Sequence, residues 1–338
     1  MTRGRRRLVA LAVLVFCLLA AEMAARLVLP RRPAPFVPST NPHLIYEWNP
    51  AYPDVNVFAR RPEGIDASTL RDRVVIAVIG DSHTYSLDLP HWMYSFPARL
   101  EYHLNAVNER SFVVLNFGVP GYNTVQELEV LRAKALPFEP DLVILQYCVN
   151  DEHVSNYIQP RFVRLNHAIH HSVLLTASWT TLLYSDFGRR HLLPYAEHAP
   201  DLLLFTPGLV GTPMSRERDS PHGPTHPTRS KDLVPARYHQ FIGRDNVENA
   251  VREFGELARR QGIPTLATGF IEDRDKSLYT ASGFQVHSFF DMFKGLDMRR
   301  YGYDPAHTDG HFSVQGNDVI GHALAKYVSG HFRLRPAG

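Results

Sequence analysis

One serine in this chain stands where a nucleophile could be activated. Ser82 belongs to the run Gly80-Asp-Ser-His83, which directly follows six apolar residues, Val74 to Ile79. An apolar run this short, rich in β-branched residues, is typical of a strand buried on both faces of a parallel sheet. A hydroxyl just beyond such a strand lies near the unpaired N–H groups of the next helix, which favour an alkoxide or an oxyanion. The alternative is that Ser82 only caps that helix.

Two more apolar runs end in polar or glycine-rich turns. Residues 112–117 run into a turn that ends at Gly121, and residues 141–147 run into a turn that contains Asn150. Because the carboxyl ends of parallel strands meet at one edge of a sheet, we expect Ser82, Gly121 and Asn150 to lie close together.

The segments between and after these strands have helical spacing. Helices are expected at residues 96–104, 125–132, 246–260 and 317–328. Thr124 is placed to cap the second helix, with Glu127 three residues further on. A fourth strand is expected at residues 263–268, whereas residues 270–303 show no regular pattern. Strands that alternate with helices in this way predict an α/β fold around a parallel sheet.

Four short blocks resemble those of the SGNH (GDSL-type) hydrolase family. In chain order they are Gly80-Asp-Ser82, Asn116-Phe-Gly-Val-Pro-Gly121, Val149-Asn-Asp151 and Asp309-Gly-His-Phe-Ser-Val-Gln-Gly316. The resemblance covers roughly residues 73–151 and 240–330. It implies a three-layer α/β/α fold of the flavodoxin-like kind, and a serine ester hydrolase that needs no metal or organic cofactor.

The resemblance also implies roles for individual residues. Ser82 would be the nucleophile, His311 its general base, and Asp309 the carboxylate that orients His311. The tetrahedral oxyanion would be held by the backbone N–H groups of Ser82 and Gly121 and by the side-chain amide of Asn150.

The carboxylate partner of the histidine has two candidates. The commonest closing block of the family has Asp three residues before His, a spacing that Asp304 and His307 satisfy, whereas Asp309 stands two before His311. We prefer Asp309 and His311, because the residues that follow them up to Gly316 match the family and lead directly into the last helix. Asp304 and His307 remain the alternates.

Neighbouring residues are expected to have supporting roles. Asp81 would brace the nucleophile turn through backbone hydrogen bonds. The family's third block usually opens with glycine, and Cys148 at that position could narrow the pocket or change how Asn150 is presented. His83 is expected to point away along the first helical turn, and both His83 and His153 are alternates for a substrate contact.

The N-terminus predicts a membrane segment. An arginine-rich head precedes an apolar run from Leu8 to Ala21, and a helix continued to Leu29 would be long enough to span a bilayer. Glu22 and Arg26 would then stand at i and i+4, able to pair. We prefer an uncleaved single-pass anchor to a cleaved signal peptide, with a buried helix of a cytosolic protein as the remaining alternative. With the basic head inside, the rest of the chain would lie outside the cytoplasm.

The predicted organisation follows from these features. Residues 1–30 would form the anchor, residues 31–72 a proline-rich stalk and lead-in, and residues 73–338 the hydrolase-like domain. An insertion at about residues 152–240 follows the third strand, so it could form a wall or lid of the site. Cys17 and Cys148 are not expected to meet in a disulfide.

The composition and the location restrict the partners. A net charge of +2, without a basic motif interleaved with aromatic residues, argues against nucleic-acid binding. An outward-facing enzyme of this type would act on an acylated carbohydrate or lipid of the envelope. Two alternatives stay open: an O-acyltransferase that uses the same site with a sugar hydroxyl in place of water, and a non-catalytic envelope binding or assembly protein. The acyltransferase is kept because exported relatives with a Gly-Asp-Ser-His opening resemble this chain at His83.

Overall fold

The computed structural model describes most of the predicted hydrolase core and the N-terminal helix. The described residues are 2–28, 36–49, 65, 67–86, 89–108, 111–152, 172–175, 178, 182, 185, 187, 236–306 and 310–334. The chain divides into two compact units, one formed by Met1–Pro38 with Ile158–Val210 and the other by Ser39–Tyr157 with Gly211–Gly338. The predicted insertion at about 152–240 lies largely outside the described residues.

A parallel sheet of five described strands forms the centre of the second unit. The strands are β3 (Val74–Ile79), β4 (Phe112–Asn116), β5 (Leu142–Tyr147), β6 (Thr265–Gly269) and β7 (Phe284–Val286). Their order across the sheet is β4-β3-β5-β6-β7, and every neighbouring pair is parallel. The order reverses direction at β3, so the carboxyl end of β3 is the point where such sheets bind their ligands. The predicted α/β class and the four predicted strands are therefore confirmed.

The strand β7 was not predicted, because it lies in the stretch that showed no regular pattern. It has only three residues, Phe284-Gln-Val286, and among the described strands it pairs with β6 alone. Three residues are too few to show a period of two, and an edge strand needs no continuous apolar run.

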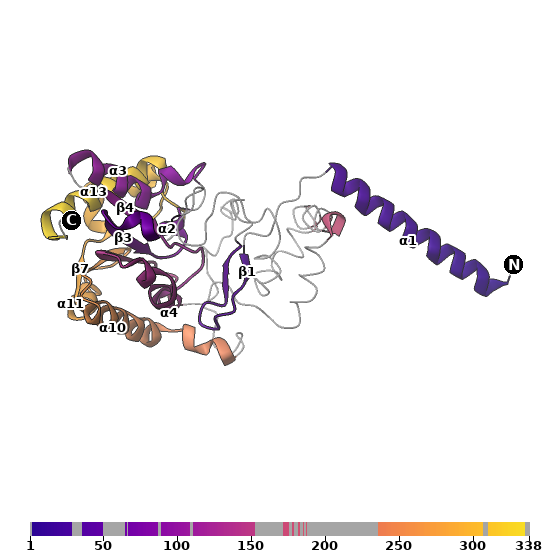
Figure 1. The fold of residues 1–338 in the computed structure, drawn as a ribbon, viewed down its shortest axis with the longest axis horizontal. Coiled ribbons are helices and arrows are strands. Elements are labelled where there is room, and N and C mark those ends of the chain that lie inside the picture. Colours follow the sequence, from indigo (N-terminus) through magenta and orange to yellow (C-terminus); the bar gives the residue numbers. More distant parts are fainter. Residues whose placement is uncertain are drawn as a thin grey trace. The chain divides into compact units, whose positions relative to one another are not determined.

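Helices cover both faces of the sheet. The α-helices of the second unit are α2 (Ser82–Tyr85), α3 (Phe96–Val107), α4 (Thr124–Val130), α10 (Arg244–Arg260), α11 (Lys276–Ala281), α12 (Phe289–Met292) and α13 (Val314–His331). Helices α3 and α13 pack together on one side of the sheet, and α4, α10 and α11 pack together on the other (Figure 1). This is the three-layer α/β/α arrangement that the family resemblance implied.

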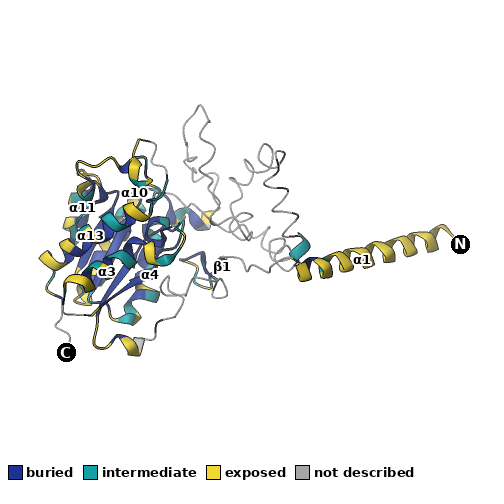
Figure 2. Cartoon of the chain, turned by 90° about the horizontal axis from the view of Figure 1, so that it is seen from above, coloured by how far each residue is buried: buried dark blue, intermediate teal, exposed yellow. Residues whose placement is uncertain are grey.

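The core lies between these layers. All six side chains of β3 are buried, and Figure 2 shows the strands as a buried layer between partly exposed helices. Alternate residues of β3, Val74, Ile76 and Val78, belong to the cluster that also contains Leu100 of α3 and Leu324 of α13. Burying one such aliphatic side chain contributes about 1.5–3 kcal/mol. This packing holds the end of β3, and with it the nucleophile turn, in a fixed position.

Part of the predicted stalk and lead-in, from Ser39 onward, belongs to the second unit. The segment contains two short strands, β1 (Phe36–Pro38) and β2 (Tyr46–Trp48). In β2 the Tyr46 hydroxyl donates to the carbonyl of Pro120 at 2.8 Å, and the Trp48 indole N–H donates to that of Gly118 at 3.1 Å. Both side chains are buried. Residues 44–48 therefore support the turn that follows β4.

The N-terminal helix α1 (Arg3–Val28) is long and apolar enough to cross a membrane or to act as a signal anchor. Its Arg26 Nε lies 2.7 Å from Glu22 Oε1, which is the i,i+4 pair expected from the sequence.

Candidate active site

The nucleophile turn is built around Asp81. Helix α2 begins at Ser82, and the fully buried Asp81 before it acts as the N-cap, because its Oδ1 accepts the N–H of His83 at 2.9 Å. The expectation that Asp81 braces this turn is confirmed. Gln146, buried in β5, adds a second brace, because its Oε1 accepts the N–H of Asp81 at 3.3 Å and the hydroxyl of Thr84 at 2.8 Å. Because Asp81 forms the cap, the hydroxyl of Ser82 is not needed for it, and Ser82 Oγ lies 3.5 Å from Asp81 Oδ2.

The hydroxyl of Ser82 lies against the imidazole of His311. The distance between Ser82 Oγ and His311 Nε2 is 3.0 Å, and the two residues are 229 positions apart in the chain. Both side chains are half-buried. A neutral imidazole that accepts this hydrogen bond through Nε2 can take the serine proton during attack on a carbonyl. The structure thus brings together the two residues for which the sequence predicted this relationship.

A buried amide holds the histidine segment in place. Asn317, on α13, accepts the Ser86 hydroxyl and the Phe96 N–H through Oδ1, each at 2.9 Å. Its Nδ2 donates to the carbonyls of Phe312 at 2.8 Å and Ser313 at 3.0 Å. Asn317 therefore ties the residues after His311 to the end of α2 and the start of α3. This role could not be predicted from the sequence, since a polar residue in a helix is usually exposed.

The turn after β4 is fastened to α2. Asn116 accepts the N–H of Gly118 at 2.9 Å and donates through Nδ2 to the carbonyl of Thr84 at 2.8 Å. Gly118 lies so close to α2 that a Cβ at this position would stand 2.3 Å from the backbone nitrogen of Tyr85. Only glycine allows this approach.

The structure describes the backbone of Gly121 and the side chain of Asn150, two of the proposed oxyanion donors. Gly121 has φ of +80°, in the left-handed region that glycine adopts without strain. Asn150 is half-buried, and its Oδ1 is turned inward, where no described group donates to it. The assignment of both residues to an oxyanion hole remains a proposal.

The prediction that Thr124 caps α4 is wrong. Asn123 is the N-cap, and it forms a reciprocal capping box with Gln126. Because Asn123 already satisfies the helix end, the Thr124 hydroxyl is free to donate to Asp151 Oδ2, at 2.6 Å. Glu127, expected to complete the cap, is instead completely buried. Thr124 thereby connects the turn after β4 to the turn after β5.

Cys148 points into the interior. It is buried and its thiol is hydrogen-bonded to the carboxylate of Asp81. Burial, followed by the charge of Asp81, raises the pKa of this thiol well above its usual range. Cys148 is therefore a neutral thiol that supports the nucleophile turn through its hydrogen bond to Asp81.

His83 lies against the histidine of the pair. Its ring centroid is 4.9 Å from that of His311 and 4.9 Å from that of Phe270. The expectation that His83 points away is thus wrong, because the first turn of α2 directs the ring toward His311. Burial, followed by the charge of His311, holds the pKa of His83 well below its usual range. His83 therefore packs as a neutral ring.

The remaining candidates are placed in part. Asp309, His307 and His153 lie outside the described residues. Asp304 Oδ1 accepts the N–H of Ala306 at 3.0 Å. The choice of Asp309 over Asp304 as the partner of His311 therefore stays a prediction. Within the described ranges, no group of three or more His, Cys, Asp or Glu side chains is arranged to hold a metal ion.

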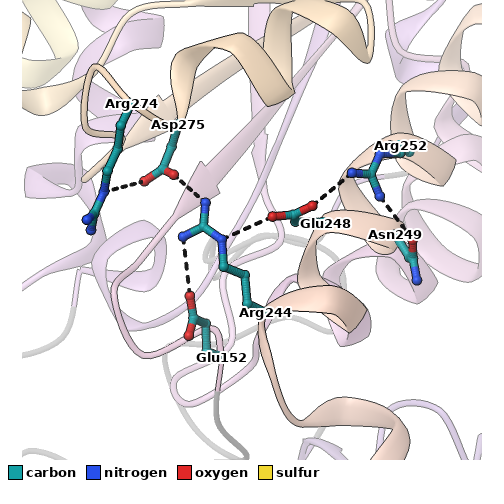
Figure 3. Close-up of polar contacts among 7 residues, drawn as sticks. All are labelled: Glu152, Arg244, Glu248, Asn249, Arg252, Arg274 and Asp275. Atoms are coloured by element: carbon teal, nitrogen blue, oxygen red, sulfur yellow. Dashed lines mark hydrogen bonds and ion pairs between the residues drawn. The ribbon is translucent and has the colours of Figure 1, made fainter.

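An ion-pair network joins the turn after β5 to the outer helices (Figure 3). The backbone carbonyl of Glu152 accepts the N–H of Gly243 at 2.8 Å, and its Oε1 lies 3.7 Å from Nη1 of Arg244. The same guanidinium binds Asp275 through Nη2 and Glu248 Oε1 through Nε, the latter at 3.0 Å. Arg244 thus connects a residue close to Asn150 with both α10 and α11.

Comparison with known proteins agrees with this geometry. The model of the GDSL-like lipase/acylhydrolase family matches residues 78–319, which is more than half of the chain. The chain belongs to this family. It is accordingly a serine esterase, and the matched span contains Ser82, Gly121, Asn150 and His311.

The solved structures that match this chain include several hydrolases. TesA is 11% identical, with a TM-score of 0.42, over 76% of this chain and 98% of TesA. A catalytic variant of Axe2, an acetylxylan esterase from Geobacillus stearothermophilus, is 14% identical, with a TM-score of 0.42, over 77% and 96% of the two chains. LAE5, an α/β hydrolase from the metagenome of Lake Arreo in Spain, is 15% identical, with a TM-score of 0.39, over 76% and 95%. No curated protein sequence matches this chain.

Proposed function

We propose that this GDSL-like esterase hydrolyses its ester through a covalent acyl-enzyme on Ser82. The observation that carries the proposal is the 3.0 Å hydrogen bond between Ser82 Oγ and His311 Nε2. It joins the first and last blocks of the family pattern, and it has the geometry that an activated serine requires.

The proposed mechanism assigns one step to each group. Ser82 Oγ attacks the ester carbonyl while His311 Nε2 takes the proton, and the N–H groups of Ser82 and Gly121 with the amide of Asn150 stabilise the oxyanion. His311 then protonates the departing alcohol, and the acyl group stays on Ser82. Water attacks the acyl-enzyme with His311 again as the base, which releases the acid. Asp309 would orient the imidazole throughout.

The proposed substrate is an O-acyl ester, acetyl or another short acyl group, on a carbohydrate or lipid outside the cytoplasm. Support comes from the N-terminal helix, which is long and apolar enough to span a membrane, and from the arginines that precede its apolar run. The positive-inside rule would place those arginines in the cytoplasm and the esterase unit on the other side.

Labelling with a fluorophosphonate probe tests the nucleophile. We expect one labelled peptide that contains Ser82, and we expect Ser82→Ala to abolish both labelling and hydrolysis of a short-chain aryl ester. Ser111→Ala, which changes an exposed serine, is the matched control and should behave as the wild type. Undiminished hydrolysis by Ser82→Ala would refute the proposal, and absence of any label would favour the non-catalytic alternative.

Product analysis separates the hydrolase from the O-acyltransferase. The same acyl-enzyme on Ser82 could pass its acyl group to a sugar hydroxyl in place of water. With an acyl donor and a sugar acceptor both present, free acid as the main product supports the hydrolase. An acylated sugar as the main product would instead show that the protein is an O-acyltransferase.

Extraction of membranes at high salt tests the anchor, since a spanning helix keeps the full-length protein in the membrane fraction.

A further inference from the structure

Three carboxyl groups close in the chain to the proposed oxyanion donors are completely buried. Asp81 follows β3, Glu127 lies on α4 after β4, and Asp151 follows β5, and each side chain is 0% exposed. Asp81 adjoins Ser82, and Asp151 adjoins Asn150. The mechanism proposed above uses none of these carboxyl groups as an acid or a base.

The three groups differ in their hydrogen bonds. Asp81 accepts the N–H of His83 and the thiol of Cys148. Burial raises the pKa of Asp81, and these two hydrogen bonds oppose that rise. Asp151 accepts the Thr124 hydroxyl at Oδ2, but no described group donates to its buried Oδ1. Both oxygens of Glu127 are buried and also lack a donor among the described groups. A buried carboxylate without donors is strongly unfavourable, whereas a protonated carboxyl carries its own donor.

His311 acts as a positive charge on Asp81, whereas the charges named as acting on Glu127 and Asp151 all come from acids. The charges that act on Glu127 are those of Asp151 and Asp81, and both are negative. The other ionisable groups around the pair are Cys148, Glu152, Tyr147 and Tyr279, all of which are acids. Burial, followed by the charge of Asp151, holds the pKa of Glu127 well above its usual range. Burial, followed by the charge of Asp81, does the same for the pKa of Asp151.

We propose that Glu127 and Asp151 share a proton, and that this neutralised pair is a positioning device for the oxyanion hole. The O–H of Glu127 supplies the donor that Asp151 Oδ1 lacks, while Thr124 supplies the donor for Oδ2. Thr124 and Glu127 are three residues apart on α4 and so share one face of that helix. Two contacts from α4 would then hold Asp151, and through it Asn150, against the turn that carries Gly121.

The consequence for catalysis is a loss of activity at alkaline pH. When the shared proton leaves, two buried carboxylates repel each other between the turns of Gly121 and Asn150. The donors of the oxyanion hole would then separate, and kcat would fall while KM changes little, because these donors act mainly in the transition state. This consequence rests on the proposed function.

The kinetic test uses two substitutions of Glu127 and one control. In the wild type, kcat should decline at alkaline pH with little change in KM. Glu127→Gln cannot ionise but can still donate, so it should lack this decline and restore most of the kcat that Glu127→Leu loses. We expect Glu127→Leu to lose up to about 100-fold in kcat at neutral pH, the scale of a misplacement near 1 Å. Glu129→Gln, on the same helix and paired with Asn41 and Arg132, is the matched control and should keep the wild-type profile.

An infrared measurement tests the proton without using activity. The spectrum of the wild type at neutral pH should contain the band of a protonated carboxyl group, and the band should be absent from Glu127→Gln. The band should persist in Ser82→Ala, so this experiment remains valid even if the proposed acyl-enzyme is wrong. Absence of the band in the wild type, or an alkaline decline in Glu127→Gln equal to that of the wild type, would overturn the inference. Circular dichroism across the same pH range excludes global unfolding as the cause of the decline.

Discussion

Replacing Gly118 by alanine should impair catalysis without touching any proposed catalytic group. Gly118 lies in the turn after β4, three residues before Gly121, and packs against the backbone of α2. The Cβ of an alanine would stand 2.3 Å from the nitrogen of Tyr85 and 2.8 Å from the carbonyl carbon of Thr84. Both neighbours are backbone atoms, so neither can rotate away as a side chain could.

The size of the effect follows from these distances. Ordinary contact begins at 3.4 Å, so the turn must retreat from 2.3 Å by about 1 Å. A displacement of about 1 Å at a reacting group can cost about 100-fold in rate. The retreat also strains the hydrogen bonds of Asn116 to Gly118 and Thr84. Overpacking of this kind typically costs about 1–3 kcal/mol of stability. We therefore expect kcat to fall about 100-fold while the protein remains folded.

The assay is steady-state hydrolysis of a short-chain aryl ester, with urea unfolding measured in parallel. Gly330→Ala is the matched control, because a Cβ there meets nothing within 4 Å and the residue lies inside α13. That control should leave kcat unchanged and stabilise the protein by about 0.5–1 kcal/mol, through the helix propensity of alanine. If Gly118→Ala keeps kcat within a factor of three of the wild type, the close approach of the turn to α2 does not position the oxyanion hole.

Three further outcomes are expected. Asn150→Ala should lower kcat by about 100- to 1000-fold with little change in KM, and an unchanged kcat in the ester assay would remove Asn150 from the oxyanion hole. The raised pKa values of Glu127 and Asp151 mean that the folded pair keeps its shared proton at pH values above the ordinary carboxyl pKa, where the unfolded state has lost it. The free energy of unfolding should therefore fall as pH rises through that range, by up to about 1.4 kcal/mol per pH unit. Urea unfolding at several pH values measures this slope, and a slope no smaller in Glu127→Gln would contradict the assignment. Arg244→Gln should lower the free energy of unfolding by about 1 kcal/mol. Arg252→Gln should lower it by less, since Arg252 contacts only Glu248 and Asn249 in this network. Equal losses in urea unfolding would show that the link from Arg244 to the turn after β5 adds no stability.

The sheet and its helices could be predicted because their signals are continuous and physical. The apolar runs that became β3, β4 and β5 are continuous enough to predict strands that are buried on both faces, and the apolar face of α10 repeats at helical spacing, with Val247, Val251 and Phe254 all buried. The contact between Ser82 and His311 could be predicted from the family blocks, because these blocks occur in the order in which the family has them.

The supporting contacts could not be predicted, because several residues can satisfy the same local rule. Asn123 and Thr124 are adjacent and both are good caps, so only the structure decides that Asn123 caps α4 and Thr124 binds Asp151. Glutamate is almost never buried without a partner, so nothing in the sequence indicated that Glu127 faces inward. The ring of His83 lies against His311 because of the rotation of α2, which a four-residue helix does not reveal in its sequence.

The contacts of β2 determine where this protein can be shortened. A soluble version that dispenses with α1 and starts at residue 73 would also lose Tyr46 and Trp48, whose side chains hold the carbonyls of Pro120 and Gly118. Such a version could still fold around its sheet and yet turn over its ester slowly, because the loop beside the nucleophile would have lost its outer support. A version that starts before Ser39 keeps both contacts. Its activity, relative to the shorter one, would measure how much the lead-in contributes to turnover.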